Sequence, residues 1–152
     1  MIGHLTEEEC RNFLKKEIVG RIGCSVNGET YVVPVNYLFD GNNIIAHSQE
    51  GKKIEMMRLN PMVCFETDNM KSLKNWTSVI GWGRYTEITD DTERWDTLHD
   101  FVNRMMYFKF SETSLPPEMM PQRMHPRSGK LKTVVFKIII NKLTGRYEIE
   151  DE

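Results

Sequence analysis

An Asn27-Gly28 step between two runs of alternating apolar residues is the feature that most restricts the fold of this chain. Both residues tolerate positive φ angles, so the step predicts a type I′ turn that joins a strand at 21–26 to a returning strand at 30–39. The apolar residues expected on one face of this hairpin are Ile22, Cys24, Val26, Tyr31, Val33, Val35 and Tyr37. A turn this short joins antiparallel neighbours, so we expect a mostly antiparallel sheet.

Cap and breaker signals divide the rest of the chain into short elements. Thr6 and Glu9 form a capping box that predicts a first helix, and Asn60-Pro61 stops a second one. Helices are expected at 6–16, 51–59 and 90–110, and further strands at 43–48, 62–68, 78–89, 131–140 and 146–150. Turns at 40–42 and 141–145, a loop at 69–76 and an irregular connector at 111–130 are expected to join them.

We expect these elements to form one mostly β (β+α) domain over residues 1–152. Six or seven antiparallel strands would make a closed or nearly closed barrel with peripheral helices, because closure removes exposed strand edges. Pro34 donates no backbone hydrogen bond, so its strand should have an open or bulged edge there. Gly81 and Gly83 predict a bulge or a close backbone approach in the strand at 78–89.

Composition excludes several classes of function. A formal net charge of −2 argues against non-specific binding of nucleic acid, which needs a basic surface. No apolar run reaches the roughly 18 residues of a membrane span, and the acidic N-terminus is unlike a signal peptide. Three scattered cysteines and four scattered histidines predict no metal site, with Cys24 and Cys64 as reduced core residues. Such thiols suit a cytoplasmic protein.

The segment 44–61 predicts an anion site. A strand ends at His47-Ser48, and Gly51, Lys52 and Lys53 then begin a helix. The helix N-terminus offers unpaired N–H groups and a positive dipole end, the lysines add charge, Ser48 adds a hydroxyl donor, and Gly51 allows close approach of the backbone. A solvated lysine pair beside an ordinary helix start is the alternative.

Two further segments are candidates for contacts with a flat heterocycle. The strand interrupted by Pro34 leaves backbone groups free, Asn36 both donates and accepts hydrogen bonds, and Tyr37 is suited to pack on a ring. The alternative is a barrel strand with one outward polar residue. Trp82, between two glycines, is suited to stack on a ligand or to seal a dimer interface, with a core tryptophan as the alternative.

No sequence pattern pairs a nucleophile with a base. The chain has no GxSxG, Walker or GxGxxG motif, so a cofactor is expected to carry any difficult chemistry.

The ordered segments 20–24, 31–37, 47–53, 60–66 and 78–84 resemble the pyridoxamine-phosphate-oxidase-like FMN-binding proteins, and most closely the nitroimidazole-resistance (Nim-type) branch. The resemblance runs from about residue 18 to residue 148. It implies a split β-barrel homodimer with two FMN molecules at the subunit interface. Cofactor contacts implied by the resemblance or by the local patterns are Val33, Pro34, Val35, Asn36, Tyr37, His47, Ser48, Gly51, Lys52, Lys53, Ser78 and Trp82.

The resemblance implies that Lys52 and Lys53 hold the FMN phosphate and that Val33 to Tyr37 line the isoalloxazine. It also implies that Ser78 contacts the flavin from a neighbouring strand. The acidic C-terminus departs from the substrate motif of the oxidases proper, so vitamin B6 oxidation is not expected. Two lysines lack the bidentate fork of an arginine, so FMN is expected to be held less tightly.

The resulting expectation is an FMN-dependent reductase that passes hydride from a nicotinamide donor to a nitroaromatic or quinone-like acceptor. His47 is the candidate proton relay, with a spectator hydrogen bond to the cofactor as the alternative. A flavin carrier or redox sensor is the second hypothesis. Haem binding through His47, His99 or His125 is the third. The segment 118–129 is expected either to close over substrate or to pack in a dimer.

Overall fold

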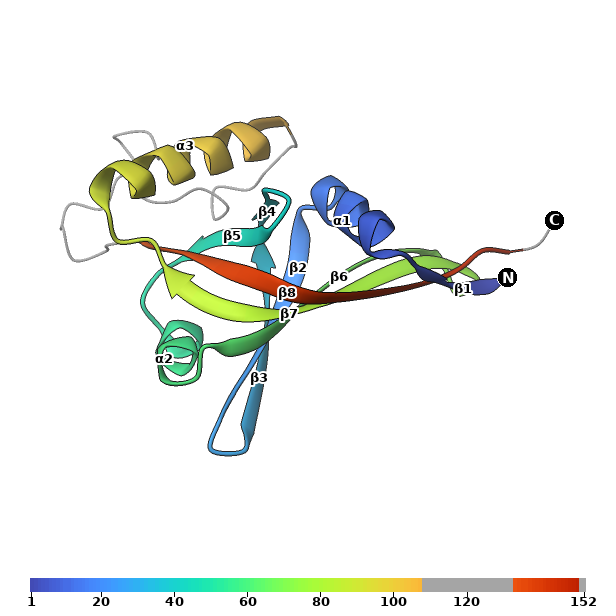
Figure 1. Ribbon diagram of the computed structural model, residues 1–152, viewed down its shortest axis with the longest axis horizontal. Helices are drawn as coiled ribbons and strands as arrows, with labels where there is room; N and C mark the ends of the chain where they lie inside the picture. The colour runs from blue at the N-terminus through green and yellow to red at the C-terminus, as the bar shows by residue number, and fades with distance from the viewer. Residues whose placement is uncertain (108–132, 151–152) are drawn as a thin grey trace.

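The computed structural model of the protein describes residues 1–107 and 133–150 (Figure 1). The connector expected at 111–130, and His125 within it, lie outside the described residues. None of the described helices is long and apolar enough to cross a membrane.

The described strands form a single antiparallel sheet. They are β1 Ile2–Leu5, β2 Val19–Val26, β3 Glu29–Asn36, β4 Leu38–Phe39, β5 Asn43–Ser48, β6 Met62–Ser72, β7 Asn75–Glu87 and β8 Val134–Glu148. The strand order is β3-β2-β6-β7-β8-β5-β4, and β1 pairs with the far end of β8. The predicted antiparallel split barrel is therefore confirmed, with eight described strands in place of six or seven.

The barrel is not closed by hydrogen bonds. Its two outermost strands, β3 and β4, are consecutive in the chain and joined through Tyr37. The sheet thus wraps round on itself while the described part of β3 has one unpaired edge. The barrel, expected to be closed or nearly closed, is split between β3 and β4. Tyr37, which joins these strands, donates its N–H to the Ile18 carbonyl at 3.0 Å and buries its ring completely.

The predicted hairpin is confirmed. Asn27 and Gly28 have φ values of 51° and 82°, as a type I′ turn requires. Cys24 pairs with Tyr31 and Ile22 with Val33, so the apolar residues of the two strands share the inner face. The turn therefore fixes which residues of β2 and β3 enter the core.

Three described helices surround the sheet: α1 Glu7–Lys16, α2 Lys52–Leu59 and α3 Asp91–Tyr107. The capping box predicted at Thr6 and Glu9 is present. In Figure 1, α3 runs along β5 and β8 on the outside of the barrel, while α2 lies at its lower end beside β7. Ile54 and Met57 of α2 are fully buried in the main core with Phe65 and Phe136.

Two expected breaks in the sheet are wrong. The segment 69–76, predicted as a loop, continues β6 and β7 as a paired ribbon. The sequence does not indicate this pairing, because residues 69–74 are all exposed and lack apolar alternation. The segment 141–145, predicted as a turn, lies within β8. Its Gly145 serves close packing, since a Cβ there would lie 2.8 Å from the Cys10 sulfur.

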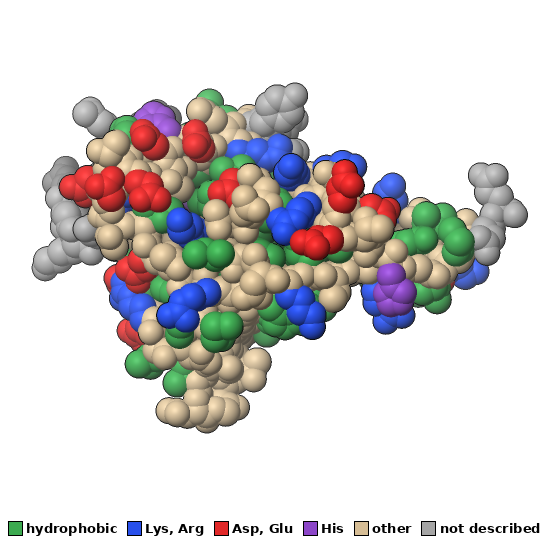
Figure 2. Space-filling model, in the orientation of Figure 1, with side chains coloured by type: hydrophobic (Ala, Val, Ile, Leu, Met, Phe, Trp, Pro, Cys, Tyr) green, Lys and Arg blue, Asp and Glu red, His purple; other side chains and the backbone are tan. Residues whose placement is uncertain are grey.

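The ends of β6, β7 and β8, together with β1, project from the barrel as an arm (Figure 1). The sequence did not predict β1. Hydrophobic side chains gather at the end of the arm in Figure 2, where Met1, Ile2 and Ile149 are exposed. The arm therefore adds surface to the protein without adding to its core.

Cys24 and Cys64 lie on opposite faces of the sheet. Cys24 is buried in the core as predicted. Cys64 pairs with Gly23 and Trp82 on the outer face and is only half-buried. The prediction of a core Cys64 is therefore wrong, because alternation along β6 turns Val63 and Phe65 inward instead.

Candidate functional site

The N-terminus of α2 faces open space. Gly51 is its N-cap residue and makes no side-chain cap, so within residues 1–107 and 133–150 the first N–H groups of the helix have no capping side chain. The φ of Gly51 is 173°, which is ordinary extended backbone, and a Cβ placed there would meet nothing within 4 Å. Glycine is therefore not needed for the backbone shape, but it leaves the helix end accessible to a ligand.

Lys53 is a half-buried cation without a hydrogen-bonding partner among the described residues. Burial lowers the pKa of its ammonium, because removal from water disfavours the charged form. Such a group gains from an anion placed beside it. Lys53 lies in the first turn of α2, where the helix dipole favours negative charge as well.

Lys52 already has a partner. Its ammonium donates to the Glu29 carboxylate at 2.6 Å and lies 5.0 Å from the centre of the Tyr31 ring. This hydrogen bond, donated by Lys52 to Glu29, raises the pKa of Lys52 and lowers the pKa of Glu29. The pair is exposed, so an incoming anion competes with Glu29 for this lysine at little cost.

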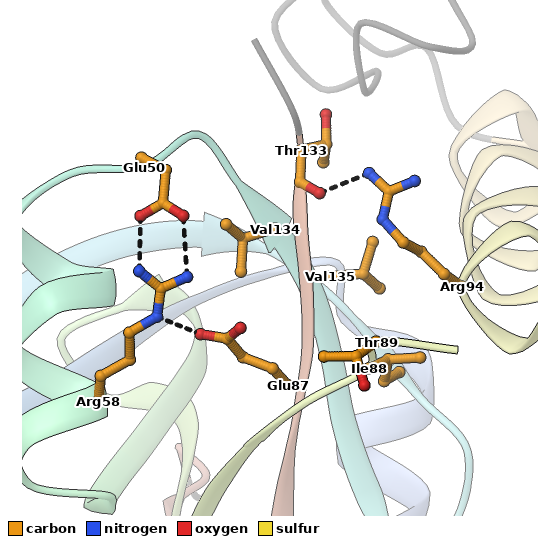
Figure 3. A pocket seen from close by; sticks show the side chains of 9 residues that line it. All are labelled: Glu50, Arg58, Glu87, Ile88, Thr89, Arg94, Thr133, Val134 and Val135. Atoms are coloured by element: carbon orange, nitrogen blue, oxygen red, sulfur yellow. Dashed lines mark hydrogen bonds and ion pairs between the residues drawn. The ribbon is translucent and has the colours of Figure 1, made fainter. Parts of the chain in front are cut away.

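A cluster that we call the Arg58 clasp holds the loop before α2. Arg58 donates through both terminal nitrogens to the Glu50 carboxylate, each at 2.8 Å, and through Nε to Glu87. Tyr85 donates its hydroxyl hydrogen bond to the same Glu87 at 2.8 Å. These bonds hold the pKa of Glu87 below its usual value. Figure 3 shows the Arg58 guanidinium between the two carboxylates.

The Arg58 clasp forms one wall of a hollow of about 180 Å³ between β7, β8 and α3. Arg94 lies on the other side and donates to the Thr133 carbonyl, with Val134 and Val135 between the two arginines (Figure 3). No local sequence pattern predicts this cluster. Glu50 and Arg58 are eight residues apart, and Glu87 lies much further along the chain, on β7.

The residues predicted on β3 point to different sides. Val33 and Val35 face the core, whereas Pro34 lies on the outer face beside Arg21. Asn36 is half-buried at the end of the strand. The expected packing of Tyr37 on a ligand ring is wrong, because its own ring is fully buried and its hydroxyl donates to the Leu14 carbonyl at 2.7 Å.

Ser78 and Trp82 lie together on the outer face of β7. Trp82 is 37% exposed, so the alternative of a core tryptophan is wrong. Ser78 donates to Glu66 at 3.3 Å, and Arg21 bridges Glu66 and Asp68. Burial, followed by the neighbouring Asp68, raises the pKa of Glu66. Strand pairing thus gives the outer face a compact group of charges.

His47 and Ser48 lie at the end of β5, and both contact other residues of the protein. The His47 ring packs edge-on against Phe101 of α3, with 4.7 Å between ring centres. Ser48 donates to the Gln49 carbonyl at 2.9 Å. His99 packs against Trp95 in the same way, at 4.9 Å. Within residues 1–107 and 133–150, no group of three potential ligands is placed to hold a metal ion.

Comparisons with known proteins found a matching family model and a related protein. A family model described as pyridoxamine 5'-phosphate oxidase matches residues 6–147. An uncharacterized protein of Rhizobium meliloti (strain 1021) is 33% identical over 149 residues, covering 93% of this chain and 92% of its own.

Solved structures share the fold. A FAD-binding protein from Mesorhizobium loti is 28% identical, with a TM-score of 0.75, and the alignment covers 99% of this chain and 98% of that one. A candidate 5-nitroimidazole antibiotic resistance protein from Bacteroides thetaiotaomicron is 19% identical, with a TM-score of 0.68 and coverage of 97% and 89%. At that identity the second similarity concerns the fold alone.

Proposed function

The chain belongs to the pyridoxamine 5'-phosphate oxidase family, and on that basis we propose that it is a flavoprotein that binds FMN by its phosphate at the N-terminus of α2. The observation that carries the proposal is Lys53, which is half-buried and has no partner among the described residues, at a helix N-terminus whose N-cap residue makes no side-chain cap. This donor set fits a phosphate, which accepts hydrogen bonds from ammonium and backbone N–H groups alike.

In this proposal each part of the site has a separate task. Lys53 and the first-turn N–H groups of α2 bind the phosphate, and Lys52 joins them on leaving Glu29. The unpaired edge of β3 offers backbone groups to the isoalloxazine, with Asn36 at its end. Bound FMN supplies hydride transfer between a nicotinamide donor and an electron-poor acceptor such as a nitroaromatic or a quinone.

A flavin carrier or redox sensor is the second candidate. The observation that favours it is the placement of His47, the predicted proton relay, against Phe101 beneath α3. Steady-state oxidation of NADH or NADPH with a nitroaromatic acceptor separates the two functions. A rate above that of free FMN supports the reductase, and a rate equal to that of free FMN supports the carrier.

Retention of flavin tests the central proposal. The purified protein is mixed with FMN or FAD and desalted, and its absorption spectrum and the Kd for each flavin are measured. Retained flavin bands, and weaker binding of riboflavin, which lacks the phosphate, are the expected results. A protein that stays colourless with both cofactors contradicts the proposal.

Replacing Glu29 by glutamine is expected to tighten FMN binding. The change frees Lys52 from an exposed ion pair, and such pairs contribute about 0.2–1 kcal/mol, so the Kd should fall by about 1.5- to fivefold. Fluorescence titration measures the change. Glu8→Gln removes the same charge from the exposed surface of α1 and serves as the control. Equal Kd values for both variants would show that Glu29 does not compete for Lys52.

We also propose that a second copy of the chain covers the outer face of the sheet. This face carries the exposed apolar residues Val19, Val32, Met62, Trp82 and Ile139. Its β6 side holds Glu66 and Asp68, and its β7–β8 side holds the exposed Arg84, Lys142 and Arg146. A twofold axis would place the acidic strand of each copy against the basic strands of the other.

Val32→Glu is expected to convert the dimer to a monomer. Val32 is 64% exposed on β3, and a buried unpaired carboxylate in an interface is strongly unfavourable. Sedimentation velocity measures the mass of the particle. Leu73→Glu, at the 84% exposed tip of the β6–β7 ribbon, is the control and should leave the dimer intact. Dimeric Val32→Glu protein would place the interface elsewhere.

A further inference from the structure

The Arg58 clasp ties both ends of α2 to the sheet. Glu50 immediately precedes Gly51, the N-cap residue, and Arg58 lies in the last turn of the same helix. The Arg58 side chain reaches back along the helix and holds the Glu50 carboxylate with two bonds of 2.8 Å. Such a bidentate contact fixes orientation as well as distance.

Glu87 connects this contact to the sheet. It lies at the end of β7, where it pairs with Phe136 of β8. Glu87 accepts from Arg58 and from the Tyr85 hydroxyl, so its own position is fixed from two sides. The Glu50–Arg58–Glu87 contacts thereby hold the loop before α2 relative to the sheet.

The Arg58 clasp also neutralises the negative charge of Glu50, which lies close to the N-terminus of α2. Glu50 is two residues from Lys52 and three from Lys53, at the helix end where an anion would bind. An unpaired carboxylate there would repel a phosphate dianion, whereas the guanidinium of Arg58 neutralises it. By orienting Glu50 and by neutralising its charge, Arg58 favours anion binding at the N-terminus of α2 in two ways.

We infer that Arg58 is a positioning residue for an anion at the N-terminus of α2, which it serves by orienting and neutralising Glu50 without touching the anion itself. The inference rests on the proposed function for its ligand, the phosphate of FMN. It concerns ligand binding and not stability, since exposed ion pairs contribute little to folding.

A set of variants separates the effect of position from that of charge. Arg58→Gln removes the bidentate contact with Glu50 and leaves the Glu50 carboxylate charged. Because Glu50 loses its charged partner, the Kd for FMN should rise by about tenfold or more. Glu50→Gln removes both the contact with Arg58 and the negative charge of Glu50, and it should raise the Kd for FMN by only about two- to threefold. The double variant should match Glu50→Gln, and Arg58→Lys should lie between wild type and Arg58→Gln.

Riboflavin and thermal unfolding provide the controls. The Kd for riboflavin and the Tm should stay close to wild type in every variant, and Lys74→Gln, which breaks the exposed Lys74–Glu150 pair on the arm, should change neither flavin affinity. Equal losses of FMN and riboflavin affinity, or a double variant as weak as Arg58→Gln, would overturn the inference.

Hydrogen exchange keeps this test independent of the proposed function. If the wild-type protein binds no flavin, the proposed function fails, yet amide exchange at residues 49–53 still reports on the loop. Faster exchange there in Arg58→Gln than in wild type supports the positioning role. Unchanged exchange shows that the Arg58 clasp does not order the loop, and the inference then fails by itself.

Discussion

Lys53→Met is expected to abolish retention of FMN on desalting while stabilising the free protein. A charge-assisted hydrogen bond to a phosphate contributes about 1.5–3 kcal/mol, so the Kd should rise by about 10- to 150-fold. Methionine fills a similar volume and removes a half-buried ammonium that has no partner among the described residues. A gain of about 1 kcal/mol would raise the Tm by about 2–4 °C in a domain of this size.

The dependence on pH gives the same prediction a second readout. Burial lowers the pKa of Lys53 in the folded protein. The unfolded chain therefore binds more protons between that lowered pKa and the ordinary lysine value, so stability of the free protein rises with pH across this window. FMN affinity should fall across the same window, because the phosphate binds the charged ammonium. Both trends should be absent in Lys53→Met.

Lys52→Met is the matched control for both readouts. Its ammonium is exposed and already paired with Glu29, so its loss should weaken FMN less and should not raise the Tm. Titration by flavin fluorescence and thermal unfolding across alkaline pH measure the two effects. Wild-type FMN affinity in Lys53→Met would move the phosphate site away from α2.

Local signals in the sequence predict the elements whose causes are local. The Asn27-Gly28 turn and the Thr6–Glu9 capping box each depend on residues within one turn, and both are present. The anion-binding pattern at Lys52 and Lys53 is local in the same way, and the structure places both residues at the start of α2.

Contacts between distant residues explain what the sequence could not predict. Tyr37 follows an alternating strand, but the Leu14 carbonyl of α1 determines where its hydroxyl points. The partner of Lys52 comes from β3, and Arg58 has one of its two partners, Glu87, on β7; nothing near Lys52 or Arg58 in the sequence indicates these contacts. Asn141 and Gly145 resemble a turn, yet pairing with β7 and β1 keeps β8 continuous through both.

The bulge between β7 and β8 makes Gly83 hard to replace. Trp82 pairs with Lys142 and Gly83 with Ile140, so Asn141 is the extra residue on β8. The β8 backbone thereby comes close to β7. A Cβ on Gly83 would lie 2.3 Å from the Ile139 carbonyl oxygen, and neither strand can move without disturbing its other neighbour.

Gly83→Ala is therefore expected to cost about 3 kcal/mol, the upper part of the range for overpacking, and to lower the Tm by about 6–12 °C. Gly81→Ala on the same strand is the matched control. Its Cβ would lie 3.0 Å from Cδ1 of Ile140, the flexible end of a side chain, so a loss below about 1 kcal/mol is expected. Urea unfolding measures both free energies. Similar values for the two variants would mean that β7 and β8 separate easily at the bulge. Pairing with β8 would then hold the end of β7, with Glu87 and the loop before α2, less firmly than the register indicates.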